Sequence, residues 1–493
     1  MICDSNLFIN LRQENILRRE KLKIFEKIDL YPNFFKKVNN ISDIYFIFDK
    51  LNFCKICFED IFFIFSGRIV NKRFFGKSFF INLQDFSGKI QLYIKKENLS
   101  IDVYNSFLLF DIGDIVWVYG FLFFTNIGSI SLKVLDIRLL VKSLISFPSK
   151  WKGLKNKELC YRNRYLDLIV NKKTKECFIN RIKLIQFIRN FFLNLGFFEV
   201  ETPMMHNIPG GASARPFKTY HNTLGINLYL RIAPELYLKK LIIGGFEKIF
   251  EINRSFRNEG LSTRHNSEFT MIEFYQAYID YKDLMELTEI LIKNLFKFLL
   301  GNIDFFENID LNSRFDCITL FNSILKYNID FESDVISNID LLRNKLNLLN
   351  ISWDNSWSLE KLQVVLFEST VEIKLKKPTF IIDYPTEISP LSKISNINCK
   401  KADRFEFFIN GFEIANGFSE LNDSILQSKK FKEQIIDSEI NFDSIYYDDD
   451  YIRALEYGLP PTAGEGIGID RLTMIFTKSL SIKDVIFFPL MKN

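Results

Sequence analysis

Residues 250–259 read FEINRSFRNE and residues 264–275 read RHNSEFTMIEFY, and these two stretches decide the fold of the larger part of the chain. Apolar and polar residues alternate in both, which predicts two β-strands joined by a polar loop. In such a hairpin one face can be shared by Arg257, Phe269, Glu273 and Tyr275. A planar guanidinium beside carboxylates suits a phosphate or a substrate carboxylate. The alternative is a solvated hairpin held by salt bridges.

A glycine-rich stretch lies near the C-terminus, where residues 458–472 read GLPPTAGEGIGIDRL. Gly464, Gly466 and Gly468 alternate along an expected strand, and glycines at this spacing let a ligand approach one face of it. Arg471 then lies at the start of a helix, where the helix dipole also favours an anion. No Gly-Lys-Ser/Thr follows the glycines, so the stretch is not a Walker P-loop. It predicts a nucleotide site of another kind.

Residues 405–420 predict a second hairpin, with strands on both sides of an Asn-Gly turn. Glu406 and Glu413 flank the turn and are expected to lie across from one another. Paired carboxylates without a base partner suit Mg²⁺ held between protein and polyphosphate. Asn416 and Glu420 follow at the same polar edge.

Upstream, residues 60–140 contain β-rich runs separated by Gly, Asn, Asp and Ser. The runs are 61–70, 78–83, 89–94, 115–121 and 130–139, with a turn expected over 71–76. Five strands in about 80 residues fit a small barrel such as an OB-fold, and a small sandwich is the structural alternative.

Changes in composition along the chain predict four parts. We expect an N-terminal helical extension (1–58), a barrel domain (59–142), a basic, sparsely structured linker (143–165) and a larger α+β domain (166–493) with a helical insertion at about 300–375. Helical spacing in 11–29 places Leu17, Leu22, Phe25 and Ile28 on one face. The extension is either an RNA-facing helix or a solvated amphipathic one.

Composition excludes several classes of protein. The formal charge of +4 over 493 residues rules out a strongly basic nucleic-acid packer, and only 3 His nearly exclude a multi-histidine metal site. Cys54 and Cys57 have no second pair, so zinc is not expected, and seven scattered cysteines fit a reducing cytosol. No apolar run suggests a membrane span or signal peptide. Met204, Met205 and Met271 are expected to pack in the core.

The order and wording of these segments resemble the three signature motifs of class II aminoacyl-tRNA synthetases, and within that class the chain resembles the bacterial lysyl-tRNA synthetases. The resemblance runs from about residue 18 to the C-terminus. The most specific wording is GGASARPF at 210–217, LRIAPELYLK at 230–239 and NGFSELND at 416–423. It implies an α+β protein with an N-terminal five-stranded OB-fold barrel that binds the anticodon, and a class II catalytic domain built on an antiparallel sheet flanked by helices.

The resemblance implies a cytoplasmic lysine–tRNA ligase that forms lysyl-adenylate and pyrophosphate from L-lysine and ATP, then transfers the lysyl group to the 3′-terminal adenosine of tRNA(Lys). Neither step needs a protein nucleophile, which agrees with the scarcity of histidine. Arg257 and Arg471 are the implied catalytic residues, and the implied ATP-binding set adds Glu259, His265 and Phe269. The resemblance implies that Glu406 and Glu413 bind Mg²⁺.

The resemblance also implies the amino-acid pocket and the tRNA contacts. The implied lysine-binding residues are Gly211, Glu235, Arg257, Glu273, Tyr275, Asn416, Phe418 and Glu420. The implied anticodon-binding residues are Arg68, Phe80 and Gln91, with a barrel-core position as the alternative for Phe80. A homodimer is expected, with residues 199–205, a short strand ending at Pro203, at its interface.

Three other functions remain open at this point. A degenerate synthetase-like module would bind tRNA or nucleotides without charging, and it would be indicated by loss of Arg257, Arg471 or an acidic metal ligand, all of which are present. A paralogue that transfers lysine to a protein resembles the catalytic half alone. An aspartate or asparagine enzyme is the nearest rival within the class.

Overall fold

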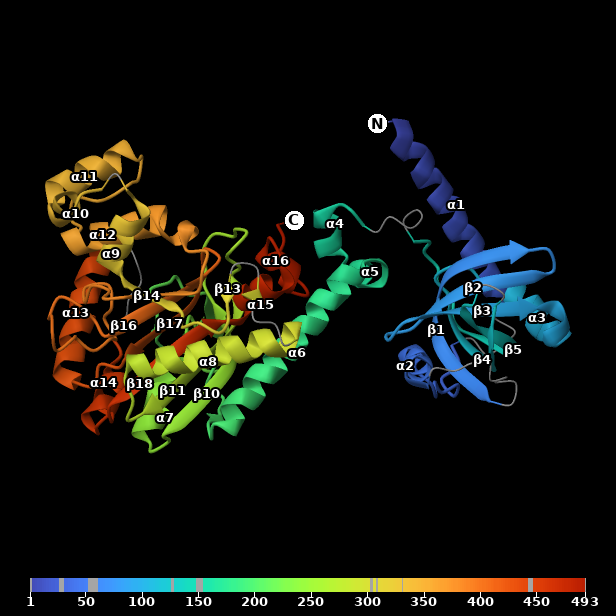
Figure 1. Cartoon of the computed structure of the whole chain (residues 1–493), viewed down its shortest axis with the longest axis horizontal. Helices are drawn as coiled ribbons and strands as arrows, with labels where there is room; N and C mark the ends of the chain where they lie inside the picture. The colour runs from blue at the N-terminus through green and yellow to red at the C-terminus, as the bar shows by residue number, and fades with distance from the viewer. Residues whose placement is uncertain are drawn as a thin grey trace. The chain divides into compact units, whose positions relative to one another are not determined.

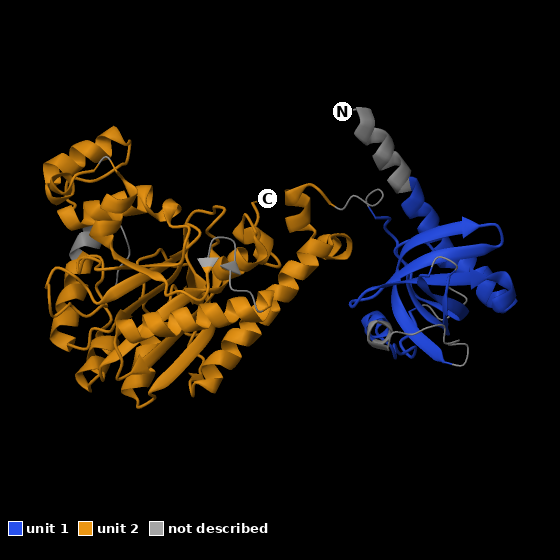
Figure 2. Ribbon diagram, viewed as in Figure 1, with its two compact units in different colours: residues 1–152 blue, residues 153–493 orange. Residues whose placement is uncertain are grey.

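The computed structural model describes residues 2–25, 31–51, 61–125, 128–147, 154–301, 305–306, 309–329, 331–441 and 447–492. It divides into two compact units, residues 1–152 and 153–493 (Figure 2). Within the described ranges, no helix has the length and apolar character that a membrane span requires.

The first unit is built around a closed five-stranded barrel (Figure 1). Its strands are β1 (Phe62–Phe75), β2 (Ser78–Gln84), β3 (Lys89–Lys95), β4 (Ile115–Phe124) and β5 (Ile130–Val141), and they close in the order β1-β2-β3-β5-β4. Its helices are α1 (Ile2–Phe25), α2 (Ile41–Leu51) and α3 (Ile101–Leu108). The five expected strands and the barrel are confirmed, and the sandwich alternative is wrong.

Two features of the barrel differ from expectation. β1 continues through residues 71–75, where a turn was expected, because its pairing with β2 shifts register between Ile69 and Asn71 and then resumes. Such a bulge bends the strand without ending it. The sequence analysis also missed α3, which is capped by the Ser100 hydroxyl and buries Val103 and Phe107 in the barrel core.

Helix α1 packs on the barrel through a face that matches the expected one at Leu22 and Phe25 but not at Leu17. Arg18 is buried and donates to the carbonyls of Ile112 (2.9 Å) and Ser143 (3.1 Å), and Phe25 is buried in the barrel core. Leu17 is 56% exposed, so the expected apolar face is wrong at that position. Ile28 lies outside the described residues.

The second unit contains an eight-stranded sheet in the order β14-β15-β16-β17-β18-β11-β10-β6. The strands are β14 (Asp316–Thr319), β15 (Thr379–Ile382), β16 (Arg404–Ile409), β17 (Phe412–Ser419), β18 (Thr462–Gly468), β11 (Glu268–Ala277), β10 (Lys248–Phe256) and β6 (Phe198–Glu199). The edge pairs β14/β15 and β10/β6 are parallel and the inner pairs are antiparallel. Both predicted hairpins, β10/β11 and β16/β17, are confirmed.

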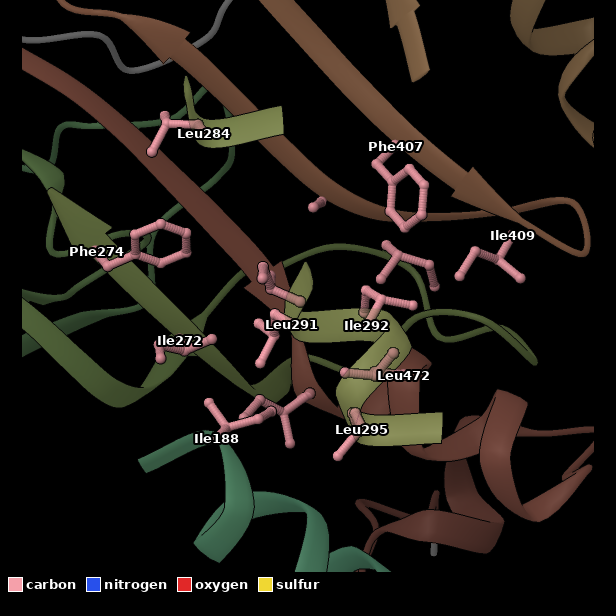
Figure 3. Close-up of a cluster of buried hydrophobic side chains, with 14 of the residues drawn as sticks. Ile188, Ile272, Phe274, Leu284, Leu291, Ile292, Leu295, Phe407, Ile409 and Leu472 are labelled. Carbon is pink, nitrogen blue, oxygen red and sulfur yellow. The ribbon is translucent and has the colours of Figure 1, made fainter. Parts of the chain in front are cut away.

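One face of this sheet carries the main apolar core. Three helices cover it, α6 (Lys172–Asn194), α8 (Tyr281–Leu300) and α15 (Ile469–Thr477). Figure 3 shows Ile188, Leu291 and Leu472 from these helices against Ile272 and Phe274 of β11. Because successive strand residues point to opposite faces, the residues between these core positions point to the other side of the sheet.

Shorter elements surround the sheet. They are α4 (Lys157–Arg162), α5 (Arg164–Val170), β7 (Met205–His206), β8 (Lys218–His221), β9 (Ile226–Leu230), α7 (Glu235–Ile243), β12 (Phe305–Phe306), β13 (Ile309–Asp310), α9 (Leu320–Tyr327), α10 (Ser333–Ser337), α11 (Ile339–Leu348), α12 (Leu359–Thr370), α13 (Ser424–Asn441), α14 (Asp449–Glu456) and α16 (Ile482–Val485). Helices α9 to α12 share a core of their own.

Several expectations need correction here. Residues 157–170 form α4 and α5 where a sparsely structured linker was expected, because Arg164 is buried and bonded to Asp167 and to carbonyls near the C-terminus. Residues 316–319, inside the expected helical insertion, form β14 of the main sheet. Met204 and Met205 are 48% and 54% exposed and do not pack in the core. Cys54 and Cys57 lie outside the described residues.

Candidate active site

The second unit contains a cavity of about 1310 Å³ over the sheet face that lies opposite the main core. Most of the residues singled out by the sequence converge there. Its lining includes Gly211, Glu235, Arg257, Glu259, His265, Phe269, Glu273, Tyr275, Glu413, Asn416, Phe418 and Arg471. Glu406 and Glu420 are not among the lining residues. The structure therefore brings most of the predicted site residues together around one cavity and leaves these two carboxylates outside its lining.

Strand β11 supplies the floor of the cavity, with Phe269, Glu273 and Tyr275 on alternate positions. Arg257 follows β10 and lies against Phe269, with its guanidinium carbon 5.2 Å from the ring centroid. The Arg257 Nε is buried and has no hydrogen-bond partner among the described side chains and backbone. A buried, unpaired guanidinium beside a cavity favours an anionic ligand there. The solvated-hairpin alternative is wrong, because Glu273 and Tyr275 are both buried.

The glycines of β18 make room for these side chains. A Cβ atom on Gly464 would lie 2.3 Å from Cε1 of Tyr275 and 2.5 Å from Oε1 of Glu420. A Cβ on Gly466 would lie 2.7 Å from Cε of Met271. The glycines therefore accommodate side chains from neighbouring strands as well as leaving one face of the strand open.

Arg471 is held at the other end of the cavity, in the first turn of α15. Its Nη1 donates to Oε2 of Glu413 (3.0 Å), and its Nη2 lies 3.1 Å from Nε2 of His265. A guanidinium only donates, so this His265 nitrogen accepts and the ring is neutral. Burial and the Arg471 charge both lower the pKa of His265, which agrees with that assignment.

The turn that presents Arg471 is anchored by a buried network that the sequence analysis missed. Asp470 accepts from the backbone N–H of Thr270 (2.7 Å) and pairs with Arg181 (2.6 Å). Arg181 also donates to the Thr270 hydroxyl. The signal in the sequence is weak, since Arg181 resembles any charged residue on a long helix.

An acidic group lines one side of the cavity. Glu235 lies in the first turn of α7, directly after Pro234, and Glu273 faces it from β11. Burial, and then the charges of Glu235 and Glu251, raise the pKa of Glu273 well above its ordinary value. Burial also raises the pKa of Glu420 to about 8, although the nearby Lys239 ammonium lowers it. Buried carboxylates this close favour a cationic ligand.

Glu406 and Glu413 are not directly opposite each other, which corrects the expectation for the β16/β17 hairpin. The Asn410-Gly411 turn places Glu413 opposite Phe408, and a register shift between Phe407 and Phe408 then places Glu406 opposite Asn416. Glu406 accepts hydrogen bonds from the Tyr384 hydroxyl (2.8 Å) and from Arg404 (2.5 Å). A one-residue bulge of this kind has no signature in the alternation of the sequence.

The electrostatics still link these two carboxylates. Burial raises the pKa of Glu406 to about 7, with Arg404 lowering it and Glu413 raising it. Burial and then Glu413 raise the pKa of Glu372 as well. Within the described part of the chain, no three His, Cys, Asp or Glu side chains form a ready metal cage. The two glutamates fit an ion that takes its other ligands from phosphate and water.

The barrel of the first unit carries the remaining predicted residues. Ile81 and Leu83 are buried inside it, so Phe80 lies on the outer face, where its ring is 5.3 Å from that of Tyr93. Gln91, on the same face of β3, accepts from the Ser131 hydroxyl (3.0 Å). The barrel-core alternative for Phe80 is wrong.

Arg68 is less close to these two residues than expected. It lies opposite Gln84, four residues along β2 from Phe80, which corresponds to about 13 Å of strand. Its guanidinium donates to the Gly113 carbonyl (2.7 Å).

Comparison with known proteins agrees with this geometry. Residues 156–492 match the family described as tRNA synthetases class II (D, K and N), and residues 63–140 match the OB-fold nucleic acid binding domain family. The chain belongs to the class II tRNA synthetases. The expected fold class is therefore confirmed in both parts, the barrel and the catalytic sheet.

Similar proteins cover nearly the whole of this synthetase. It is 52% identical over 432 residues to a lysine–tRNA ligase of Vesicomyosocius okutanii, covering 87% of each chain. It is 53% identical over 428 residues to a lysine–tRNA ligase of Legionella pneumophila (strain Lens), covering 86% of each. It is 46% identical over 491 residues to a lysine–tRNA ligase of Coxiella burnetii (strain Dugway 5J108-111), covering 98% of this chain and 99% of that one.

Proposed function

We propose that this synthetase is a lysine–tRNA ligase. A carboxylate oxygen of L-lysine attacks the α-phosphorus of ATP, the bond to the β-phosphate breaks, and pyrophosphate leaves. A ribose hydroxyl of the 3′-terminal adenosine of tRNA(Lys) then attacks the lysyl carbonyl carbon, and AMP leaves. The observation that carries the proposal is the wall of buried carboxylates beside Arg257, because it offers anionic partners for an ammonium group and a cation for a carboxylate.

Arg257 holds the lysine carboxylate and the α-phosphate and stabilises the charge that develops on the phosphoryl oxygens. Its unpaired buried Nε supports this role. Phe269 and Arg471 bind the adenine from its two faces, and Glu259 and His265 hold the nucleotide at the cavity rim. None of these residues forms a covalent bond, so catalysis rests on position and charge.

The amino-acid pocket separates lysine from uncharged competitors. Glu235 accepts from the α-ammonium, and Glu273, Tyr275 and Glu420 take the ε-ammonium. Gly211, with φ at 86°, keeps the approach to Glu235 free of a side chain. Asn416 and Phe418 complete the pocket. A neutral side chain would leave buried carboxylates unpaired, which costs about 1–3 kcal/mol or more for charged groups.

Mg²⁺ is the proposed metal, held by Glu406 and Glu413 together with the phosphates. When bound, it neutralises phosphate charge. The mutual repulsion of the two carboxylates supports this assignment, since a cation would relieve it. In the Glu406→Gln, Glu413→Gln double variant we expect the Mg²⁺ dependence to be lost with most of the activity, and an unchanged Mg²⁺ titration would contradict the assignment.

The barrel is the proposed anticodon-binding domain, with Phe80 stacking on a base, Gln91 bonding its edge and Arg68 contributing charge nearby. The half-exposed Phe80 ring beside Tyr93 supports this. We expect Phe80→Ala to weaken tRNA charging by about 1–3 kcal/mol per stacked base while amino-acid activation is unchanged. Equal loss in both assays would contradict it.

A cytoplasmic homodimer is the proposed assembly, with residues 199–205 at its interface. Exposed apolar side chains in and around that segment support it, namely Phe198, Met204, Met205, Tyr220 and Leu224. Sedimentation of Met205→Asp should show monomer where the natural chain shows dimer. A natural chain that sediments as a monomer and still charges tRNA would contradict the dimer.

The experiment that tests the function is ATP–pyrophosphate exchange with each of the twenty amino acids, with Mg²⁺ present. We expect exchange with lysine alone. Exchange with aspartate or asparagine would show instead that the protein is an aspartate or asparagine enzyme of the same class. No exchange with any amino acid, from a folded protein, would favour the non-charging binding module.

A further inference from the structure

A buried lysine of the protein lies behind the acidic side of the cavity, bonded to Glu235 of its lining, and none of the roles above uses it. Lys239 is on α7, one turn after Glu235, and is fully buried. Its ammonium lies 2.6 Å from Oε1 of Glu235 and also pairs with Glu420. It lies over the rings of Phe418 (5.5 Å) and Tyr451 (5.9 Å).

This lysine keeps its charge. Burial lowers the pKa of Lys239, but the carboxylates of Glu235 and Glu420 outweigh burial and raise it above its ordinary value. In return, the ammonium lowers the pKa of Glu420, which burial and Glu235 raise. The ion pairs therefore favour the charged form of Lys239 and oppose the effect of burial on Glu420.

We propose that Lys239 is a positioning residue for the substrate lysine: its ammonium bridges Glu235 and Glu420, fixes both carboxylates in the pocket wall and holds them ready for the amino groups of the substrate. The inference rests on the function proposed above. Three buried carboxylates, Glu235, Glu273 and Glu420, face the two cations Lys239 and Arg257.

The geometry of Glu420 shows that the bridge leaves an acceptor free. Oε1 of Glu420 is buried and has no hydrogen-bond partner within the described residues. It faces β18, where a Cβ on Gly464 would lie only 2.5 Å away. Lys239 therefore holds one oxygen of this carboxylate and leaves the other for an incoming ammonium, which a freely rotating glutamate would not offer in one place.

The test compares two adjacent lysines on one helix. Lys239→Met removes the buried ammonium and keeps most of the side-chain volume. Lys240→Met is the matched control, because Lys240 is paired with Asp450 at the surface. We expect Lys239→Met to raise the KM for lysine at least about tenfold, with the KM for ATP changed by less than about twofold. Lys240→Met should behave as the natural chain.

The pH profile separates positioning from a purely structural role. The titratable groups around the Lys239 ammonium are Glu235 of α7, Glu273 and Tyr275 of β11, Glu420 after β17, and Tyr451 of α14. The charges of Arg231, Glu251 and Arg257 act in turn on Glu273. Without the ammonium, the pKa of Glu420 rises further, so this carboxyl is protonated over more of the neutral range. The KM for lysine of Lys239→Met should therefore fall more steeply with rising pH than that of the natural chain.

Chemical rescue gives a further readout. In Lys239→Ala, added propylammonium should lower the KM for lysine, because it can occupy the vacated space, whereas it should not stimulate the natural chain. Should Lys239→Met fail to fold, Lys239→Arg carries the test. It keeps the charge but cannot place it at the same point, and it should raise the KM for lysine at unchanged thermal stability.

The outcomes distinguish this inference from the proposed function. If the natural chain does not activate lysine, the proposed function is wrong, and so is the positioning role of Lys239. If the natural chain activates lysine and Lys239→Met keeps its KM for lysine, or raises the KM values for lysine and ATP equally with no amine rescue, the positioning role alone is overturned.

Discussion

The two faces of the large sheet differ in how their buried groups are satisfied. On one face Ile272 and Phe274 of β11 are fully buried among apolar side chains (Figure 3). On the other, Glu273 and Tyr275 of the same strand are just as buried but border the cavity. The apolar face is fully packed, whereas the cavity face has buried polar side chains that can still bind a ligand. The comparison teaches that one strand can supply stability on one side and electrostatic binding capacity on the other.

The cavity face should be sensitive in activity and the core face in stability. Arg257→Ala should give the largest effect, a loss of about 10²–10³-fold in lysine-dependent exchange, because it removes a buried donor aimed at developing charge. The fold should survive, as shown by an unchanged circular dichroism spectrum. Arg254→Ala is the control, because Arg254 lies on the strand that Arg257 follows and has an exposed partner (Glu268, 3.3 Å), and it should stay near natural activity. Near-normal turnover in Arg257→Ala would remove the assigned role.

The complementary variant is on the core face and should change stability rather than activity. Phe274→Ala deletes a fully buried ring that packs 4.5 Å from that of Phe192. It should lower the free energy of unfolding by about 3–5 kcal/mol, measured by urea denaturation, while each folded molecule keeps its KM for lysine. Ile290→Ala, at an exposed position of α8, should cost little. If Phe274→Ala changed the KM for lysine and left stability intact, the division between the two faces would be wrong.

A smaller effect is expected at the junction of the faces, where β18 passes beneath the pocket. Gly464→Ala would place a methyl group 2.3 Å from the Tyr275 ring and 2.5 Å from Glu420, so both must move. The KM for lysine should rise about tenfold or more. In Gly466→Ala the new methyl would be too close only to the flexible end of Met271 (2.7 Å) and would touch Glu273 Cγ at an ordinary 3.5 Å, so the rise should be smaller. Equal effects from both variants would show that the pocket tolerates the shift.

The smallest effect concerns an acidic group whose side chain is bonded to helix α8. Glu465 of β18 is buried, and the hydroxyl of Thr288 on α8 lies 2.7 Å from both of its oxygens. Burial raises its pKa to about 8, with the Thr288 hydrogen bond lowering it. Between the unfolded pKa and pH 8 the folded state therefore binds the additional proton, and stability falls as pH rises through this window.

Glu465→Gln should remove that dependence. We expect the variant to match the natural chain near pH 5 and to be more stable at pH 8, measured by thermal unfolding at several pH values. A natural chain whose stability does not fall across this window, or a variant that is less stable at pH 8, would contradict a neutral Glu465 in the folded state.

Local pattern predicted much of the fold because burial follows alternation. The five barrel strands and both hairpins of the large sheet were readable from the order of apolar and polar residues and from turn residues such as Asn410 and Gly411, which have φ of 53° and 74°. Features that depend on distant partners were not readable. Arg164 orders the expected linker through carbonyls more than 300 positions away, and the bulge after Phe407 changes which residue faces Glu406.

The sequence by itself determined the family, the two-part architecture and most of the residues around the cavity, because motif residues and strand periodicity are local properties of the chain. Only the tertiary structure decided which charges compensate one another. Lys239 and Lys240 are indistinguishable in sequence, yet one is fully buried between two carboxylates and the other is paired at the surface. The reason is physical: the energy of a charge depends on its burial and on the partners that folding brings to it.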